Sequence, residues 1–470
     1  MLFSDIPKVL INADIKGTLP KKKINLITDH SNKVDSGALF VINKDKNFKQ
    51  SYLKDALSND LEVILTNIYL KKITLTQVVV KDVDKEVLNL LKYRQPIQPK
   101  LSIGITGTNG KTSTTWYLGQ ICNTNKIPTK LVGTLGYYKN LKKIKDSILT
   151  TPNNLDLYQF AYSNKKNQNY LISEASSHGL HQGRLNNINI DIAAITNLSH
   201  DHLDYHKNFT SYTKSKFLLF TKVLNKNGIA VINYRLNNYN ILKKKLKSKN
   251  IKIITFGSKD IYFNKNSTSI LNILGKKYKI KKLNINSIQK ENLECAIACA
   301  IAMNIKINNI IKILPNLKSA PGRYEEINYA KKFSKIVIDF AHTPEAIIHV
   351  LKTYTNNKIK PSIVFGCGGD RDKKKRKKMA IIAKKYANRI YLTDDNPRNE
   401  NPDDIRKTLK KYCSKGIEIS DRRLAIKKAI REIDTNEILI IAGKGHEKYQ
   451  IIKNNKIKFD DYKIAKNFIK

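Results

Sequence analysis

This chain of 470 residues has few cysteines and no long apolar run, and both shortages exclude a class of protein. Its five cysteines form no C-x-x-C pair and leave an odd one over, as expected in a reducing compartment. No stretch approaches about 18 uncharged apolar residues, and the first residues lack a charged segment leading into a long apolar one. We therefore expect a cytoplasmic protein that is neither secreted nor membrane-spanning.

Acidic residues are also scarce, at 39 against 86 Lys and Arg, which gives a formal net charge of +47. Such an excess usually predicts binding to nucleic acid or another polyanion. Lysine is scattered with asparagine and isoleucine along the whole chain, however, and only Lys373 to Lys378 forms a dense run. We favour a solvated basic surface over an RNA groove or a nuclear-targeting signal, and expect no nucleic-acid partner.

The length of 470 residues exceeds one ordinary core and predicts about three domains. Short apolar runs and polar loops before Pro96 and Pro99 indicate a small α/β domain over residues 1–98. A second boundary near Ala320-Pro-Gly-Arg leaves a central α/β domain over 99–319. Strands alternating with helices over 320–470 predict a second doubly wound, Rossmann-like domain.

The stretch SIGITGTNGKTS, Ser102 to Ser113, has the composition of a phosphate-binding loop. An apolar run, Leu101 to Thr106, predicts a strand before it, and Thr112 to Cys122 can continue as a helix. Glycines let backbone N–H groups approach phosphate oxygens, lysine adds a mobile positive charge, and a threonine hydroxyl can ligate Mg²⁺. The first glycine of the common P-loop pattern would fall on Ile105, so the match is partial. The predicted ATP contacts are Gly107, Thr108, Asn109, Gly110, Lys111, Thr112 and Ser113.

Two later strands end in groups that can bind metal. Leu171 to Ser173 delivers Glu174, and a carboxylate at a strand's carboxyl end can hold Mg²⁺ beside a nucleotide. A strand over Ile192 to Thr196 leads into Asn197 to His206, which carries three histidines and two aspartates. These lack zinc spacing, and solvated loop side chains are the alternative for both groups.

Five motifs in one collinear order carry a resemblance: TGTNGKT, EASSHGL, DHLDYH with Lys216 fourteen positions after His202, GCGGDRD, and TDDNPR with GKGHE. Together they resemble the Mur ligase family, and the loop alone also resembles the related folylpolyglutamate synthetases. The resemblance covers essentially the whole chain. It implies a small UDP-binding domain, a P-loop ATPase-type domain with a mostly parallel sheet, and a C-terminal domain that binds the amino acid.

The resemblance also implies ATP and Mg²⁺ as cofactors. Its catalytic residues would be Lys111, Glu174, His202 and Lys216, and its metal ligands Thr112, Glu174, His202 and a carbamylated Lys216. Asn292 and Arg323 would contact ATP, although Asn286 and Gln289 replace the Gly and Asn of the family's adenine-closing stretch.

The first substrate implied is UDP-N-acetylmuramoyl-L-alanyl-D-glutamate. Two departures affect its binding: Asn32 stands where the family usually has arginine, and the family's His-Gln-x-D-G stretch is absent around Asp45 to Gln50. The residues implied for this substrate are Ser31, Thr150, Thr151, Ser176, Gln182 and Arg184.

The second substrate implied is meso-diaminopimelate, because D-N-P-R accompanies it in ligases of this type. Its far carboxylate requires a fixed cation, which Arg398 supplies. The residues implied for this site are Arg371, Asp395, Asn396, Pro397, Arg398, Gly443 and Glu447. The implied reaction is ATP-dependent amide formation through an acyl phosphate in peptidoglycan precursor synthesis.

Two alternatives stay open from the sequence. One is a relative that adds another amino acid, or glutamate to folate, which EASSHGL and DNPR disfavour. The other is a weakened P-loop protein that binds RNA through its basic surface. In the favoured case we expect a monomer whose partners are small molecules.

Overall fold

The structure is a computed structural model that describes residues 1–45, 48–166, 169–265, 267–281, 283, 285–355 and 359–469, with the backbone alone at 203 and 204. The chain divides into two compact units. The first contains Met1–Ile280 and Glu294–Ile313, and the second contains Lys281–Leu293 and Leu314–Lys470. Each unit is described by itself below.

The first unit begins with a five-stranded sheet of order β1-β5-β4-β3-β2, parallel except at the β1 edge. All five residues of β3 are buried, as expected for a central strand covered on both faces. Residues of α1 and α3 pack on one face and residues of α2 on the other. The bounds are β1 Asp14–Lys16, β2 Leu26–Thr28, β3 Ala38–Ile42, β4 Val63–Thr66, β5 Thr76–Val79, α1 Ile6–Val9, α2 Gln50–Leu57 and α3 Val83–Arg94.

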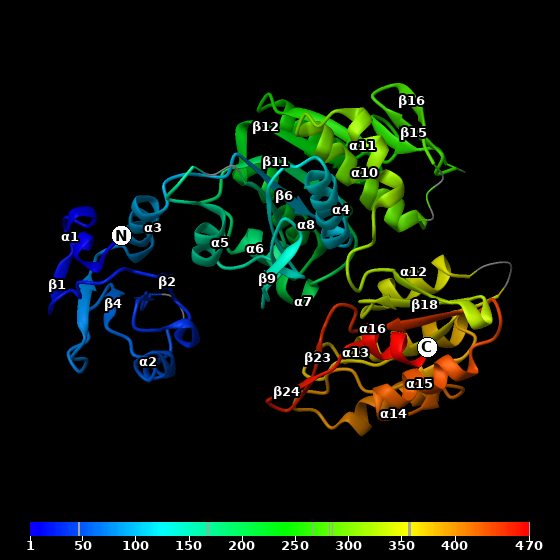
Figure 1. Ribbon diagram of the computed structural model, residues 1–470. Helices are drawn as coiled ribbons and strands as arrows, with labels where there is room; N and C mark the ends of the chain where they lie inside the picture. Colours follow the sequence, from blue (N-terminus) through cyan, green and yellow to red (C-terminus); the bar gives the residue numbers. More distant parts are fainter. Residues whose placement is uncertain are drawn as a thin grey trace. The chain divides into compact units, whose positions relative to one another are not determined.

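The rest of the first unit is built on an 11-stranded sheet, whose strand order is β16-β15-β14-β13-β12-β11-β6-β10-β7-β8-β9. It is parallel from β14 to β7 and antiparallel at both edges. Figure 1 shows α4 beside β6 in this part. The strands are β6 Leu101–Thr106, β7 Thr129–Gly133, β8 Gly136–Lys139, β9 Lys142–Lys145, β10 Tyr170–Glu174, β11 Ile190–Ile195, β12 Leu224–Asn233, β13 Lys252–Phe256, β14 Ile261–Phe263, β15 Ile270–Ile273 and β16 Lys276–Lys279.

Short and long helices alternate with these strands, as parallel pairing requires. A π-helical turn over Leu219–Val223 follows α8 directly. The helices are α4 Lys111–Thr124, α5 Asn154–Ala161, α6 Ser177–His181, α7 Leu203–His206, α8 Phe209–Leu218, α9 Tyr239–Lys247 and α11 Ile307–Ile313. The helix α10 Ser287–Ala302 is divided between the units, because its residues up to Leu293 belong to the second.

The second unit contains a six-stranded sheet of order β17-β18-β22-β19-β20-β21, antiparallel only between β17 and β18. Alternate residues of β22 face two different helical layers: Ile440 and Ala442 pack with α12, α13 and α14, whereas Leu439 and Ile441 pack with α15 and α16. This is the doubly wound arrangement. A two-stranded sheet of β23 and β24 follows.

The bounds in the second unit are β17 Glu325–Tyr329, β18 Ser334–Asp339, α12 Pro344–Thr353, β19 Ser362–Phe365, α13 Lys374–Tyr386, β20 Ile390–Leu392, α14 Pro402–Tyr412, β21 Ile417–Glu418, α15 Arg422–Glu432, β22 Ile438–Ala442, β23 Tyr449–Ile452, β24 Asn455–Lys458 and α16 Asp461–Phe468.

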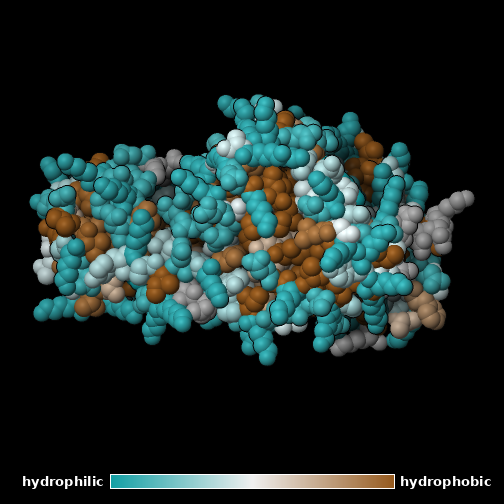
Figure 2. All heavy atoms as spheres, turned by 90° about the horizontal axis from the view of Figure 1, so that it is seen from above, coloured by the Kyte–Doolittle hydropathy of each residue, from teal (hydrophilic) through white to brown (hydrophobic). Residues whose placement is uncertain are grey.

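The α/β class and the mostly parallel sheets predicted from the sequence are confirmed. The domain boundaries at 98 and 319 stay predictions. All five cysteines are buried and free. No helix within the described residues is long and apolar enough to cross a membrane. Hydrophilic side chains are spread over the face seen in Figure 2, with hydrophobic patches between them.

Candidate functional site

The glycine-rich loop lies where the order of the strands in the sheet reverses. From β6 the chain passes through α4 to β7, on the far side of β10, whereas β11 pairs with the other edge of β6. The registers align Glu174 with Ile105 and Ile195 with Thr106. The carboxyl ends of β6, β10 and β11 therefore lie side by side, and such a switch point is where open α/β sheets bind ligands.

The loop itself needs glycine at its first position. Gly107 has φ +144°, and a Cβ there would lie 1.9 Å from the Thr196 Oγ1 atom. Gly110, with φ +83°, caps the N-terminus of α4. The loop is also held from the end of β11, because Asn109 N donates to Asn197 Oδ1 over 2.9 Å. The backbone at this helix N-terminus is therefore fixed where a phosphate would bind.

Two lysines share one carbonyl of this loop. Lys111 Nζ donates to the carbonyl oxygens of Gly107 and Thr108 over 2.8 and 2.9 Å. Lys216 Nζ, on α8, donates to the same Gly107 oxygen over 2.8 Å. Lys216 is 1% exposed, and its burial, reinforced by the nearby charge of Lys111 and opposed by Asp201, holds its pKa well below the ordinary lysine value. The family resemblance alone had identified Lys216, and the structure places it against the loop.

Glu174 is buried at the end of β10, and the hydroxyl of Thr112 donates to its Oε2 atom over 3.0 Å. Thr134 donates to the same carboxylate through its backbone N–H at 2.9 Å and its hydroxyl at 3.1 Å. A small cavity of about 10 Å³, close to the volume that one water needs, is lined by Thr112 and Glu174 together with mainly apolar residues. Oxygen donors of this kind fit Mg²⁺. No larger group of metal-ligating side chains occurs within the described residues.

His202 packs against the aromatic ring of His178 and lies beside the carboxylate of Asp201. Its backbone has φ +52°, and its Nε2 atom lies 3.4 Å from Asp201 Oδ2. The imidazole of His178, from α6, meets that of His202 edge to face, with ring centroids 4.8 Å apart. Tyr205 and His206 of α7 also contact His178. The role of His202 as a metal ligand stays a prediction.

Most residues predicted for the UDP-linked substrate lie close together. Thr151 Oγ1 donates to the Glu174 carbonyl over 2.8 Å and accepts the Ser176 N–H over 2.8 Å. Arg184 donates to the Thr151 carbonyl over 2.7 Å and also to Gln182. The Thr150 and Thr134 hydroxyls lie 3.1 Å apart. This network connects directly to Glu174 and hence to the phosphate loop.

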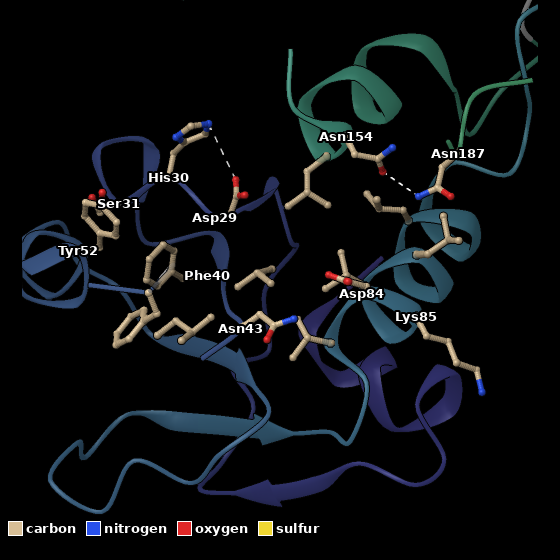
Figure 3. A pocket seen from close by; sticks show the side chains of 18 of the residues that line it. Asp29, His30, Ser31, Phe40, Asn43, Tyr52, Asp84, Lys85, Asn154 and Asn187 are labelled. Atoms are coloured by element: carbon tan, nitrogen blue, oxygen red, sulfur yellow. Dashed lines mark hydrogen bonds and ion pairs between the residues drawn. The ribbon is translucent and has the colours of Figure 1, made fainter. Parts of the chain in front are cut away.

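Ser31 and Gln182 line one cavity of about 1110 Å³ in the first unit. Figure 3 shows Phe40 of β3, Tyr52 of α2 and Ser31 of the turn before β3 on one side, and Asn154 and Asn187 on the other. Its charged lining comprises Asp29, Asp55, Asp84 and Lys85, with His30. For a protein of net charge +47, this lining offers an anionic substrate few cations.

The edge of this cavity is held by contacts that the sequence did not suggest. Asn153 caps α5 and donates to Asp29 Oδ1 over 2.8 Å, and its amide nitrogen lies 3.0 Å from His30 Nε2. Lys33 forms a 2.6 Å ion pair with Asp156 of α5. Asn32, which replaces the family's arginine, also lines the cavity.

In the second unit, the predicted amino-acid site gathers at the carboxyl ends of β19, β20 and β22. Asn396 Nδ2 donates to Glu447 Oε2 over 2.8 Å. Gly443 has φ +111°, and a Cβ there would lie 2.7 Å from Asp395 Oδ2. The Arg398 guanidinium donates to the Gly369 carbonyl over 2.9 Å, in the loop that carries Arg371. Asp395, Asn396, Arg398, Gly443 and Glu447 are thus in one place.

The loop with Arg371 is anchored from α13. Arg376 is buried and donates to Glu400 Oε1 over 3.0 Å, and this bond, with the Asp370 N–H, lowers the pKa of Glu400 to about 2. A cavity beside the amino-acid cluster, about 670 Å³, is lined by Asp394 and Gln450 among others. Gln450 donates to the Asp395 carbonyl over 2.7 Å.

Lys444 is the residue in this cluster that sequence reasoning missed. It is fully buried, and its ammonium donates to Asn396 Oδ1 over 3.0 Å and to Glu447 Oε2 over 3.2 Å. The signal was available, because a lysine between two glycines directly after a strand resembles the phosphate loop in composition. Thr134, which donates twice to Glu174, carried no signal in the sequence.

Arg323 and Asn292 were predicted to contact ATP, and both fall in the second unit. The guanidinium of Arg323 lies over the Phe340 ring, 4.5 Å from its centroid. Arg323 also lowers the pKa of the buried Asp339 carboxyl, against the stronger effect of burial, which raises it. Their contacts with a nucleotide stay predictions.

Comparison with known proteins identifies the family. Residues 105–303 match the Mur ligase middle domain, and residues 322–445 match the Mur ligase, glutamate ligase domain. UDP-N-acetylmuramoyl-L-alanyl-D-glutamate--2,6-diaminopimelate ligase of Rickettsia conorii is 36% identical over 453 residues, covering 93% of this chain and 94% of its own.

Solved structures agree. A structure of UDP-N-acetylmuramoyl-L-alanyl-D-glutamate--2,6-diaminopimelate ligase has a TM-score of 0.63 at 30% identity, covering 100% of this chain and 98% of its own. The MurF ligase of Thermotoga maritima in complex with ADP has a TM-score of 0.63 at 17% identity, covering 90% and 94%, and shares the fold. On these matches, which extend over nearly the whole chain, the protein belongs to the Mur ligase family.

Proposed function

We propose that the protein joins meso-2,6-diaminopimelate to UDP-N-acetylmuramoyl-L-alanyl-D-glutamate, using ATP and a divalent cation. The supporting observation is the cluster at the carboxyl ends of β6, β10 and β11. There the phosphate loop, Glu174 and Lys216 are linked by hydrogen bonds to Thr112 and to the Gly107 carbonyl. A phosphate-binding loop and a carboxylate that can hold a metal are groups that phosphoryl transfer uses.

In the first step, an oxygen of the D-glutamyl carboxylate attacks the γ-phosphorus of ATP, and ADP leaves. Both reactants are anionic, so cations must lie between them. Lys111 is the nearest cation that the loop itself provides, and it must leave the Gly107 and Thr108 carbonyls to reach a phosphate. The phosphate loop and Lys111 therefore position the nucleotide and neutralise the transferring group.

Thr112, Glu174 and His202 are the residues that would hold Mg²⁺ in this proposal. When bound, the ion neutralises phosphate charge and fixes the phosphate geometry. The Thr112 hydroxyl would offer a lone pair to the metal, and its hydrogen can still be donated to Glu174. Thr134 keeps the Glu174 carboxylate in place from its other side.

Lys216 is proposed to be carbamylated. Carbamate formation requires the neutral amine, which attacks CO₂ and loses a proton, and burial favours that neutral form. The product is an anion that could ligate a metal beside Glu174. Asp201, which raises the pKa of Lys216, acts in the opposite direction and is the smallest of the three influences.

In the second step, the amine nitrogen of diaminopimelate attacks the acyl carbon, and inorganic phosphate leaves. Arg398 and Arg371 supply cations for the carboxylates of the amino acid, and Glu447 and Asp395 supply anions for its ammonium. A diamine with two carboxylates balances these charges, whereas lysine leaves one guanidinium without an anion.

The UDP group is assigned to the cavity of about 1110 Å³ that Ser31 and Gln182 share. Thr151, Ser176 and Arg184 then extend from that cavity toward Glu174, in the direction that the muramoyl peptide must follow to reach the ATP. Since ATP and UDP-linked precursors are cytoplasmic metabolites, we place the reaction in the cytoplasm.

The test is release of phosphate from ATP with each substrate omitted in turn. We expect release only when the UDP-linked dipeptide, meso-diaminopimelate, ATP and Mg²⁺ are all present, with a new amide in the product by mass. Equal release without the dipeptide would rule out the proposed reaction. If L-lysine or glutamate supported the same rate of phosphate release, the assignment of diaminopimelate as the second substrate would be wrong.

A further inference from the structure

Lys444 lies between two glycines with positive φ, Gly443 at +111° and Gly445 at +52°, in the turn after β22. Its side chain is fully buried. A buried lysine is rare unless it is paired, because removing an ammonium from water costs several kcal/mol. The contacts of Lys444 therefore indicate its role.

Among the described residues, every side chain that Lys444 contacts through its ammonium belongs to the proposed amino-acid site. Nζ donates to Asn396 Oδ1 over 3.0 Å and to Glu447 Oε2 over 3.2 Å, and it lies 3.9 Å from Asp395 Oδ1. One buried charge is thus shared among three groups that would meet the substrate.

The first consequence concerns the orientation of the Asn396 amide. Its Oδ1 atom accepts from Lys444 and also from the Ile451 N–H over 2.9 Å. With the oxygen held on that side, the amide nitrogen must point the other way, where it donates to Glu447 Oε2 over 2.8 Å. An asparagine amide has no intrinsic preference between its two orientations, so the cation decides it.

The second consequence concerns Glu447. Its Oε2 atom receives two donors, from Asn396 and Lys444, which fixes the carboxylate plane. Within the described residues, no hydrogen bond to Oε1 is found, and the side chain is 21% exposed. The Oε1 atom is thus left to accept a hydrogen bond from an amino acid's ammonium group.

We propose that Lys444 is a positioning residue that determines specificity for the amine substrate. It orients Asn396 and Glu447 toward the substrate's ammonium and cancels one of the two charges of Asp395 and Glu447. This inference rests on the proposed function. Without the charge of Lys444 the site becomes more negative, which favours lysine over an amino acid with two carboxylates.

The test compares Lys444→Gln, Lys444→Met and the matched control Lys448→Met. Gln keeps an N–H donor without the charge, Met removes both, and Lys448 is an exposed lysine in the same segment. Steady-state kinetics would be measured with meso-diaminopimelate and with L-lysine, and the KM of ATP and of the UDP-linked dipeptide would be followed as well. Unfolding temperature would be recorded for each variant.

For Lys444→Gln we expect a rise of about tenfold or more in the KM of meso-diaminopimelate, with little change in kcat, because uniform binding is lost. The preference for diaminopimelate over lysine should narrow by a similar factor. The KM of ATP and of the dipeptide should stay unchanged, and Lys448→Met should match the unaltered protein. If Lys444→Met folds, it should show the same changes in KM and in preference more strongly. If Lys444→Met does not fold, the result for Lys444→Gln alone tests the proposal.

An unchanged KM for diaminopimelate and an unchanged preference in Lys444→Gln would overturn the proposal. So would a parallel rise in all three KM values, which indicates a structural role, or a fall in kcat alone. Failure of the proposed function is recognised separately, because the unaltered protein would then release no phosphate in response to diaminopimelate.

Discussion

Lys216 and Lys444 are buried to the same extent, at 1% and 0% exposure, but their neighbours differ. Lys444 donates to a carboxylate and a side-chain amide. Lys216 donates to a backbone carbonyl, lies over the Tyr212 ring, and has no carboxylate within ion-pair distance in the described part of the chain. Lys111 lies nearby and lowers the pKa of Lys216 further.

The difference is between a lysine held as an ion and a lysine suited to react. Carboxylates offset the cost of burying an ammonium, and the ion then orients its partners. A buried amine that lacks such partners favours its neutral, nucleophilic form. Burial alone therefore does not predict what a lysine does, and the nearest anion decides it.

The largest effect on activity is expected from replacing Lys111, whose charge adds to burial in lowering the pKa of Lys216. Lys111→Ala should reduce turnover by about a thousandfold or more, because it removes the charge nearest the transferring phosphoryl group. The fold should remain, since the side chain donates to the Gly107 and Thr108 carbonyls of its own loop. Phosphate release and circular dichroism measure these outcomes, and turnover at the unaltered rate would refute the nucleotide assignment.

Lys216→Ala tests the reactive member of the pair directly. We expect near-complete loss of activity, partly restored by a short carboxylic acid in solution that replaces the carbamate. Lys214→Ala is the control, because Lys214 is exposed on the same helix. Activity of the unaltered protein should also rise with added bicarbonate. Full activity of Lys216→Ala without the acid would exclude a carbamate.

Arg398→Ala tests the balance of charges in the proposed amino-acid site, to which Lys444 also contributes. A diaminopimelate carboxylate needs the guanidinium, so the preference over L-lysine, expected at about a thousandfold, should largely disappear. Arg398 has φ +52°, so Arg398→Asn is the better-tolerated companion, because asparagine adopts that conformation at lower cost. Relative kcat/KM values for the two amines measure the effect. A preserved preference in both variants would show that another cation binds the far carboxylate.

The sequence predicted the strands and the loop well, because short apolar runs next to glycine leave few alternatives. It placed Glu174 at the carboxyl end of a strand, and parallel pairing sets that end beside the end of the strand before the phosphate loop. It could not predict that Lys216 and Lys111 share the Gly107 carbonyl, since that contact joins positions 109 residues apart. Lys444 was missed because a lysine in a polar turn is usually exposed. Nor could it show that the cavity near Ser31 is lined by aspartates.

The smallest effect, and the most direct comparison of the two lysines, is on stability. Lys444→Met removes the ammonium that contacts Glu447 and Asp395 and should cost about 3 kcal/mol. Lys216→Met removes a buried amine that has no carboxylate within ion-pair distance among the described residues, so the protein should be unchanged or more stable by about 1 kcal/mol near neutral pH in bicarbonate-free buffer.

The stability difference between the unaltered protein and Lys216→Met should also depend on pH. Because the pKa of Lys216 is lower in the folded than in the unfolded state, the unfolded state binds more protons between those two values. The unaltered protein should therefore gain stability relative to Lys216→Met as pH rises toward 10.5, the ordinary lysine value. Denaturant unfolding from pH 7 to pH 9.5 measures this difference. If Lys216→Met instead destabilised the protein as much as Lys444→Met does, at every pH, then Lys216 would be paired as an ion, and the distinction between the two lysines would be wrong.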